Sequence, residues 1–215
     1  MRVRAFVDAW RYPTLTPTPL PMGKGLRSRD VKVDHNLEIE TERLLLRLPR
    51  AEDFDGYAEL HADEVAARHI GGSLVRTAAW RKFLQLPGAW MIQGYAMFSI
   101  IDKTSGEWLG QCGPWQPLGW PGTEVGWALR RSAWGKGYAY EAALAAIDWS
   151  FDNLGWTDVI HSINADNAPS QALAKRLGSR ILRQANLPPP YETIVCDIWG
   201  QSRAEWRARR NGAPQ

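Results

Sequence analysis

A glycine-rich turn in the second half of the chain holds the residues whose types and spacing could bind an anion. In the stretch RRSAWGKGYAYEA, Gly135 and Gly137 flank Lys136 just before a helical pattern begins. The first N–H groups of a helix have no internal partners, and the helix dipole favours negative charge there. Glycine would let a phosphate approach this backbone, and Lys136 would add a positive charge. The stretch therefore predicts a phosphate or pyrophosphate site, with a tight turn that only needs positive φ as the alternative.

Glu124 begins the strand-like stretch that leads into this turn. Side chains alternate across a strand, so Val125, Trp127 and Leu129 share one face of EVGWAL, which we expect in the core. Glu124 falls on the other face, whose central residues are small. A carboxylate beside a partly dry groove can take a proton from an ammonium group when its pKa is raised. Glu124 is therefore a candidate base, and an exposed carboxylate at a strand end is the alternative.

Several other site chemistries do not fit the sequence. The Walker pattern GxxxxGKS/T is missing, and Tyr140 stands where GxGxxG needs its third glycine, which disfavours a nucleotide-binding Rossmann site. The histidines, cysteines and acids lack metal-ligand spacing, so we expect no metal. Cys112 and Cys196 have no evident activating partner, which disfavours a covalent acyl-cysteine route.

The elements that must position these residues form an α/β (α+β) pattern, with a strand hairpin in the first half and a β-α-β-α run in the second. Periodicity and turn signals set the boundaries. Helices are expected over about 52–69, 138–152, 168–177 and 202–210, with one or two short helices within 76–94. Strands are expected at 44–46, 95–102, 108–117, 123–130, 158–165, 179–185 and 193–200. The helix over 138–152 has an apolar stripe of Tyr140, Leu144, Ile147 and Phe151.

We expect one domain over 37–206, preceded by a Pro-rich basic extension over 1–36 and followed by a basic tail over 207–215. The extension lacks periodicity and is expected to be poorly ordered. The chain has 26 Lys and Arg and 23 Asp and Glu, but residues 36–200 hold only 15 of the basic residues and 19 of the acidic ones. The positive balance therefore lies at the ends. A nucleic-acid partner is not expected, because such a protein places its basic stripe on the folded face.

The compartment follows from what the sequence lacks. No run approaches the roughly 18 apolar residues that a membrane helix needs, so no membrane association is expected. The two cysteines do not form a disulfide framework, and the N-terminal segment lacks the apolar region of a secretory signal. A reducing cytosol is the simplest compartment, and we expect a cytoplasmic protein.

Taken in order, the motifs resemble the GNAT superfamily of acyl-CoA-dependent N-acyltransferases. EVGWAL, WGKGYAYEA, NAPS and KRLG follow one another as in that superfamily, and the chain looks most like its RimJ/RimL-type branch of ribosomal-protein N-terminal acetyltransferases. ETERLLLRLPRAEDFD and IWGQSRAEW extend the similarity over about residues 37–206. The resemblance implies a mixed, mostly antiparallel central sheet with flanking helices, in which the parallel strands 123–129 and 158–165 splay apart.

The resemblance also implies acetyl-CoA as co-substrate, with its pyrophosphate on the backbone of the glycine-rich turn. The family usually has Gln or Arg three residues before the first glycine, where this chain has Ser132 beside Arg131, so the side chain that supports the phosphates is left open. Asn167 would contact the pantetheine arm, and it is also suited to cap a helix, two roles that are compatible. The implied cofactor-binding residues are Trp134, Gly135, Lys136, Gly137, Tyr138, Ala139 and Asn167.

Two residues receive catalytic roles in this interpretation. Glu124 is the general base, since the family often has an acid at this strand position. Ser170 would hydrogen-bond or protonate the departing CoA thiolate, because many members carry Tyr for that task where this chain has Ala174. A solvent-facing serine in the first helical turn is the alternative for Ser170. His161 is expected to be a packed strand histidine rather than a base.

The predicted function is direct transfer of an acetyl group from acetyl-CoA to a primary amine, with a protein N-terminal amine as one acceptor. A small-molecule amine, such as an aminoglycoside, an amino acid or a polyamine, is an alternative acceptor. A non-catalytic acyl-CoA-binding or sensor protein of the same fold is the alternative to an enzyme. A homodimer stays open. Trp115 and Trp120 could line the acceptor pocket or pack in the core.

Overall fold

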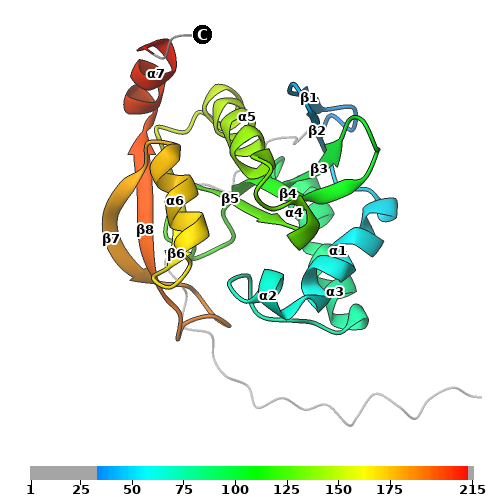
Figure 1. Cartoon of the computed structure of the whole chain (residues 1–215). Helices are drawn as coiled ribbons and strands as arrows, with labels where there is room; N and C mark the ends of the chain where they lie inside the picture. The colour runs from blue at the N-terminus through cyan, green and yellow to red at the C-terminus, as the bar shows by residue number, and fades with distance from the viewer. Residues whose placement is uncertain (1–32, 213–215) are drawn as a thin grey trace, which may run out of the picture. The chain divides into compact units, whose positions relative to one another are not determined.

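The computed structural model describes residues 33–212 of the chain (Figure 1). Residues 1–32, which are most of the predicted extension, and residues 213–215 at the end of the predicted tail lie outside this range. Helix α7 (Arg203–Gly212) covers most of the predicted tail and confirms the expected terminal helix. The predicted domain boundaries stay predictions.

Within the described range, an eight-stranded sheet has the order β1-β2-β3-β4-β5-β6-β8-β7. Neighbouring strands are antiparallel except for β5 and β6, which run parallel. This confirms the expected mixed, mostly antiparallel sheet. The strands are β1 (Glu38–Glu40), β2 (Leu44–Arg47), β3 (Phe98–Asp102), β4 (Trp108–Trp115), β5 (Glu124–Leu129), β6 (Asp158–Asn164), β7 (Arg180–Asn186) and β8 (Val195–Ser202).

The parallel pair β5 and β6 separates almost as soon as it forms. The two strands are in register only at Glu124 and Ile160, whereas β4 and β5 pair at six positions. Beyond that point the ring of His161 reaches across, and its Nδ1 lies 2.7 Å from the carbonyl oxygen of Val125. The strands therefore splay as expected, with side chains in the gap where backbone hydrogen bonds would otherwise form.

Helices cover both faces of this sheet. Val125 and Leu129 of β5 face α5 (Tyr138–Asn153), and α6 (Ala168–Arg176) lies beside β6. Ala128, on the opposite face of β5, packs in the cluster formed with α1 (Phe54–Ala62) and α3 (Arg76–Phe83). Helix α4 (Gln85–Gln93) follows α3 directly. A short 3-10 turn, η1 (Ala51–Asp53), precedes α1, and η2 (Arg131–Ala133) follows β5.

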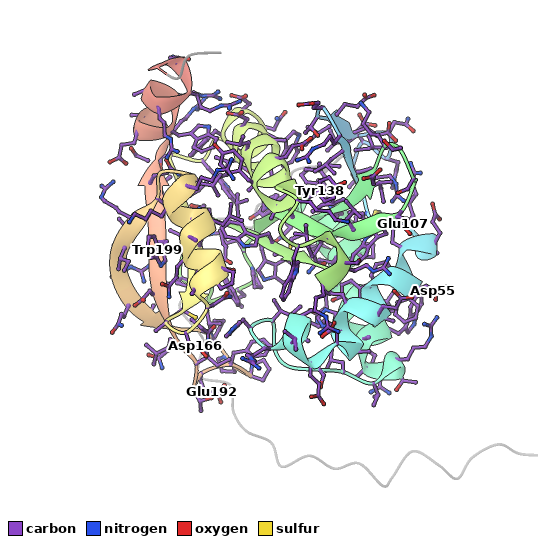
Figure 2. The ribbon with its side chains drawn as sticks, viewed as in Figure 1. Asp55, Glu107, Tyr138, Asp166, Glu192 and Trp199 are labelled. Carbon is purple, nitrogen blue, oxygen red and sulfur yellow. The ribbon has the colours of Figure 1, made fainter. Side chains whose placement is uncertain are left out.

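Two predictions about buried faces are partly wrong. Tyr140 and Leu144 are only half-buried, because α5 meets the sheet through a face rich in small residues. The alanines of α5 let the helix approach the sheet closely. Tyr138 is the first residue of α5 (Figure 2). Trp127 is also only half-buried, because its ring occupies the gap between β5 and β6. The buried residues of α5 are Ala142, Ala143, Ala146, Ile147, Ser150 and Phe151.

The helix expected over 52–69 is broken near its middle, so that prediction is wrong as one continuous element. Asp63 is extended (φ −78°, ψ 108°), and its carboxylate accepts hydrogen bonds from the N–H groups of Val65 and Ala66. This cap ends α1 and starts the short helix α2 (Glu64–Ala67). The break turns the chain over the sheet face that carries Glu124.

Candidate active site

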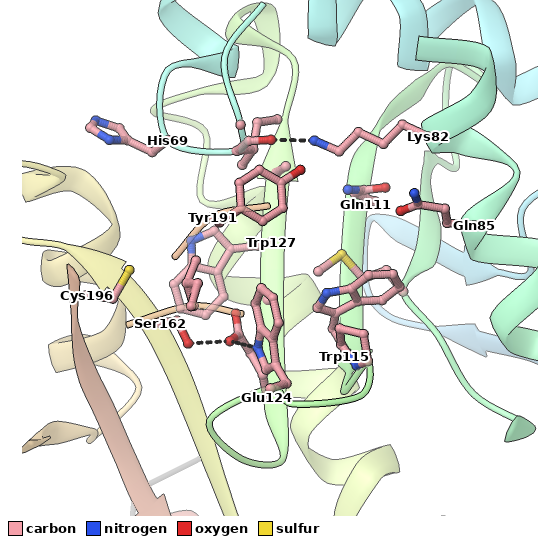
Figure 3. A pocket seen from close by; sticks show the side chains of 18 of the residues that line it. His69, Lys82, Gln85, Gln111, Trp115, Glu124, Trp127, Ser162, Tyr191 and Cys196 are labelled. Carbon is pink, nitrogen blue, oxygen red and sulfur yellow. Dashed lines mark hydrogen bonds between the residues drawn. The ribbon is translucent and has the colours of Figure 1, made fainter. Parts of the chain in front are cut away.

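A cavity of about 660 Å³ lies along β5 on the face covered by α1 and α3 (Figure 3). Strands β4, β5 and β6 contribute to it, together with α1, α3, α4 and the loops 115–120 and 187–191. Its volume falls in the range of pockets that hold small ligands, and polar groups in such a partly dry space interact strongly. The aromatic residues that line it are Tyr57, Trp115, Trp120, Trp127 and Tyr191.

Glu124 lies in this cavity with 7% of its surface exposed, so it is buried rather than exposed at a strand end. Its Oε2 accepts two hydrogen bonds of 2.6 Å, from Nε1 of Trp120 and from Oγ of Ser162. Burial raises the pKa of Glu124 to about 7, and the two hydrogen bonds act in the opposite direction. The carboxylate therefore titrates near neutral pH, where a general base works best.

The cavity also reaches the start of α6, where Asn167 and Ser170 line it. Oδ1 of Asn167 accepts a 3.3 Å hydrogen bond from the backbone N–H of Ser170, so the side chain caps the helix. Oγ of Ser170 accepts a 3.3 Å hydrogen bond from Nε1 of Trp127. Both residues therefore combine a structural contact with a position in the cavity, and their predicted roles toward CoA stay predictions.

The glycine-rich turn after β5 has the backbone that its sequence implies. Gly135 and Gly137 have φ values of +73° and +81°, which favour glycine, and Gly137 caps α5. A Cβ on Gly135 would meet no atom within 4 Å, so the surface there is open. The N–H groups of residues 135–137 donate no hydrogen bond to any described residue. The turn does not line the cavity. Its anion-binding role stays a prediction.

Side chains around this turn hold it from the outside. Nη1 of Arg43 donates to the carbonyl oxygen of Lys136 at 2.9 Å, and the same guanidinium pairs with Glu141 at 2.7 Å. Trp134 is fixed by a 2.9 Å hydrogen bond from its Nε1 to the carbonyl of Leu129. The hydroxyl of Tyr138 donates to Asp102 at 2.9 Å. With these side chains engaged, Trp134 and Tyr138 would meet a ligand mainly through their backbone, and Ala139 has only its backbone to offer.

The two arginines just before the turn are paired with acids of the α1 region. Nη2 of Arg130 lies 2.6 Å from Glu59, and Nε of Arg131 lies 2.9 Å from Asp63. These ion pairs connect the segment that follows β5 with α1, through Glu59, and with the helix break, through Asp63. The arginine next to Ser132 is thus engaged within the protein.

His161 and the two cysteines are not suited to accept a proton. His161 is buried, and burial lowers its pKa to about 4, although the contact with Val125 acts in the opposite direction. The structure therefore makes His161 the packed strand histidine that was expected. Burial raises the pKa of Cys196, which lines the cavity, to about 11, and it also raises the pKa of Cys112. Both thiols are protonated at neutral pH, which disfavours an acyl-cysteine route.

Some residues of the cavity were not predicted from the sequence. Ser162 was missed as a partner of Glu124, although it lies two residues beyond Ile160 on the same side of β6 and alternation could have placed it there. His61, Lys82 and Gln111 were missed because they come from α1, α3 and β4, and no sequence spacing brings them together. Trp115 and Trp120 both line the cavity.

No group of three or more His, Cys, Asp and Glu side chains within residues 33–212 could hold a metal ion. None of the helices in the same range combines the length and the apolar character that crossing a membrane requires.

Comparisons with known proteins agree with this geometry. The family model of the acetyltransferase (GNAT) domain matches residues 43–180. The chain is 31% identical over 155 residues to the uncharacterized N-acetyltransferase p20 of Bacillus licheniformis, covering 71% of this chain and 85% of p20. It is 35% identical over 100 residues to the uncharacterized protein YkkB of Bacillus subtilis, covering 44% of this chain and 58% of YkkB, which is less than two thirds of that protein. The crystal structure of an acetyltransferase from Agrobacterium tumefaciens superposes with a TM-score of 0.66 at 28% identity, covering 77% of this chain and 94% of that chain.

Proposed function

The chain belongs to the acetyltransferase (GNAT) domain family, and we propose that it transfers the acetyl group of acetyl-CoA to a primary amine. Membership of this family makes it an acyltransferase. The observation that carries the finer proposal is Glu124, a buried carboxylate with a pKa of about 7 in a cavity beside the gap between β5 and β6.

Glu124 accepts a proton from the ammonium group of the acceptor, directly or through water, and so frees the nitrogen lone pair for attack. The hydrogen bonds from Trp120 and Ser162 both end on Oε2, which leaves Oε1 for the amine. A Cβ on Gly126 would stand 3.3 Å from Oε1. Glycine at this position therefore keeps the approach to that oxygen open.

Acetyl-CoA supplies the thioester. The N–H groups of residues 135–139 bind its pyrophosphate, because they have no partner among the described residues and lie at a positive helix end. Asn167 contacts the pantetheine arm. The amine nitrogen forms a bond to the carbonyl carbon as the carbon–sulfur bond breaks, and Ser170 donates a hydrogen bond to the departing sulfur or protonates it. Holding the two substrates together supplies proximity.

Two features of the chain favour two different classes of acceptor amine. The sequence resemblance to the RimJ/RimL-type branch favours a protein N-terminal amine. The cavity of about 660 Å³ supports a small-molecule amine as a second candidate, since it has the size of a small-ligand pocket.

Substitution of the base tests the proposal. We expect Glu124→Gln to bind acetyl-CoA as the unmodified protein does, since the turn at 135–137 is untouched, and to release CoA about 10²- to 10⁴-fold more slowly with amines. Calorimetry measures the affinity, and a thiol assay across classes of amine measures the rate.

Glu107→Gln is the matched control, because Glu107 is exposed near the end of the β3–β4 turn (Figure 2) and does not line the cavity. Unchanged turnover in Glu124→Gln would remove Glu124 from the role of base. A protein that binds acetyl-CoA but acetylates none of the amines would instead be an acyl-CoA-binding protein of this fold.

A further inference from the structure

Among the described residues that line the cavity, Glu124 is the single carboxylate and Lys82 the single lysine or arginine. Lys82 comes from α3 and donates to the carbonyl oxygen of Ile70, and it forms no salt bridge within the described chain. Burial lowers the pKa of Lys82 to about 8, so the amine is still mostly protonated at pH 7. A charge in a partly dry space without a counter-ion is unfavourable, and an anionic group on a ligand would offset this.

Two other side chains of the cavity have buried polar atoms without a hydrogen-bond partner among residues 33–212. His61 is fully buried, and neither of its ring nitrogens has a hydrogen-bond partner among the described residues. Oε1 of Gln111, a residue only 9% exposed, is also unpaired there. Burial and then the charge of Lys82 lower the pKa of His61 to about 3, so its neutral ring offers one N–H donor. Buried polar groups are normally hydrogen-bonded, so unpaired side chains that line a cavity point to a ligand group. The N–H of His61, the ammonium of Lys82 and the amide NH2 of Gln111 are all donors, which suits a ligand group that only accepts hydrogen bonds.

These polar groups lie away from Glu124. Gln111 pairs with Ala128, which is four residues beyond Glu124 on the same face of β5. At a rise of about 3.3 Å per residue, this places them roughly 13 Å apart along the sheet. Figure 3 shows Lys82 and Gln111 toward one end of the pocket and Glu124 toward the other. In the same view, the rings of Trp127 and Tyr191 lie between the two ends.

We propose that His61, Lys82 and Gln111 form an acceptor subsite that binds a carboxylate. The acceptor is then a small primary amine with an apolar or aromatic body and a carboxylate at the end remote from the amine. This inference rests on the proposed function, because Glu124 receives the amine end. It excludes polyamines and aminoglycosides, since a second ammonium group would lie near Lys82 with no second carboxylate to receive it.

Two amines that differ only at the remote end test the subsite. We expect 4-(2-aminoethyl)benzoate to be acetylated with a kcat/KM about 100-fold or more above that of phenethylamine, because a site built to bind a polar group rejects the analogue that lacks it. Spermidine and a short peptide amide with a free N-terminus are measured alongside. Either of them matching the benzoate, or equal values for the two aromatic amines, would overturn the inference while leaving the proposed function intact.

Variants then assign the preference to the subsite. Lys82→Met keeps most of the length of the side chain and removes the charge, and we expect it to reduce the benzoate preference to below about tenfold. Arg81→Met is the matched control, because Arg81 is the exposed neighbour on α3 and does not line the cavity. If Lys82→Met fails to fold, Gln111→Leu provides the same comparison. A preference that survives both substitutions contradicts the assignment.

A binding measurement separates failure of the subsite from failure of the proposed function. 4-Ethylbenzoate lacks the amine, and its binding is followed by the fluorescence of the tryptophans in the cavity. We expect its Kd to rise at least about tenfold in Lys82→Met, a change expected for loss of a charge-assisted hydrogen bond. This result supports the carboxylate subsite even if no amine is acetylated, an outcome that would overturn the proposed function alone. An unchanged Kd would overturn the subsite.

Discussion

Glu124 has the properties of a base because its surroundings remove water but leave it hydrogen-bonded. Trp120 and Ser162 both donate to Oε2, and each of these bonds favours the charged carboxylate. Desolvation outweighs them and moves the pKa to about 7, well above the value of roughly 4.3 for an exposed glutamate. At the scale of the residue, the proposed base therefore depends on the balance between burial, which raises the pKa of Glu124, and hydrogen bonds, which lower it.

The first prediction at this scale concerns pH. We expect kcat with a saturating amine to rise with pH through a midpoint near pH 7 and to level off about one pH unit higher, because only the deprotonated form of Glu124 can accept a proton. Ser162→Ala removes a hydrogen bond that lowers the pKa of Glu124, so the midpoint should move to higher pH. Rate profiles between pH 5 and 9 measure both. A flat profile, or a midpoint that moves downward, would contradict the role of Glu124.

Sequence reasoning located Glu124 but not what tunes it. Alternation along EVGWAL places this carboxylate on the face of small residues, and the structure puts that face in the cavity. The indole of Trp120 reaches back across a loop, and Ser162 comes from a strand 38 residues later. Hydrogen bonds across a loop or between distant strands follow no periodic pattern in the sequence. The size of the pKa shift of Glu124, and the residues that hydrogen-bond to it, therefore could not be predicted.

At the scale of the element, the start of α5 depends on a backbone conformation that side chains disfavour. Gly137 has φ +81°, and an added Cβ would lie 3.4 Å from Nη2 of Arg43, the side chain that holds the carbonyl of Lys136. We expect Gly137→Ala to lower the free energy of unfolding by about 1 kcal/mol and to weaken acetyl-CoA binding, because the N–H groups of the turn would shift. Urea denaturation and calorimetry measure the two effects.

A second glycine provides the control for backbone strain. Gly106, in the turn between β3 and β4, has φ +73° and would meet no atom within 4 Å if it carried a Cβ. Gly106→Ala should therefore cost a similar stability of about 1 kcal/mol without changing acetyl-CoA affinity. If both variants bind acetyl-CoA equally well, the turn at 135–137 does not hold the diphosphate.

The elements themselves were mostly predictable, because period and turn residues agree over long stretches. The β3–β4 hairpin, β5, α5, β6 and α6 all lie where alternation, helical spacing and the glycines place them. The break at Asp63 was not foreseen, because EDFDGYAELHADEVAARH keeps a helical pattern through it and only the cap hydrogen bonds end the helix. The buried face of α5 was misjudged because Ala143 and Ala146 pack closely, whereas a stripe of large residues was expected.

At the scale of the whole molecule, the buried carboxylate makes stability depend on pH. The folded protein binds the proton of Glu124 more tightly than the unfolded chain does, so its contribution to stability is full below about pH 4 and is lost as pH rises through about 7. Glu124→Gln cannot ionise. We expect it to be more stable than the unmodified protein at pH 8, by up to about 3 kcal/mol, and by only about 1 kcal/mol at pH 5.

Denaturation in urea at the two pH values measures this difference, with Glu107→Gln as an exposed control. A stabilisation by Glu124→Gln that is the same at pH 5 and pH 8 would mean that the carboxylate does not change its charge in this range. That result would also remove the reason for the expected pH dependence of turnover.

The cavity is the feature that only the whole fold could reveal. The GNAT-like order of motifs identifies the strands that splay, but it does not mark His61, Lys82 or Gln111, each of which looks like an ordinary helix or strand residue. Helical spacing predicts on which face of its own helix His61 or Lys82 lies. Only the packing of α1 and α3 over β4 brings both side chains into the cavity with Gln111. The proposed carboxylate subsite was therefore beyond sequence reasoning, although Trp115 and Trp120 were named as candidate pocket residues.

The two hydrogen bonds on Oε2 of Glu124 also bear on how the proposed base loses its proton after each reaction cycle. A carboxylate that collects a proton in each cycle must discharge it to bulk solvent before it can work again. The indole of Trp120 cannot pass this proton on, because its nitrogen can donate a hydrogen bond but has no free lone pair to accept a proton. The hydroxyl of Ser162 can both donate and accept a hydrogen bond. Of the two side chains bonded to Glu124, it is therefore the one that can begin a proton relay to solvent.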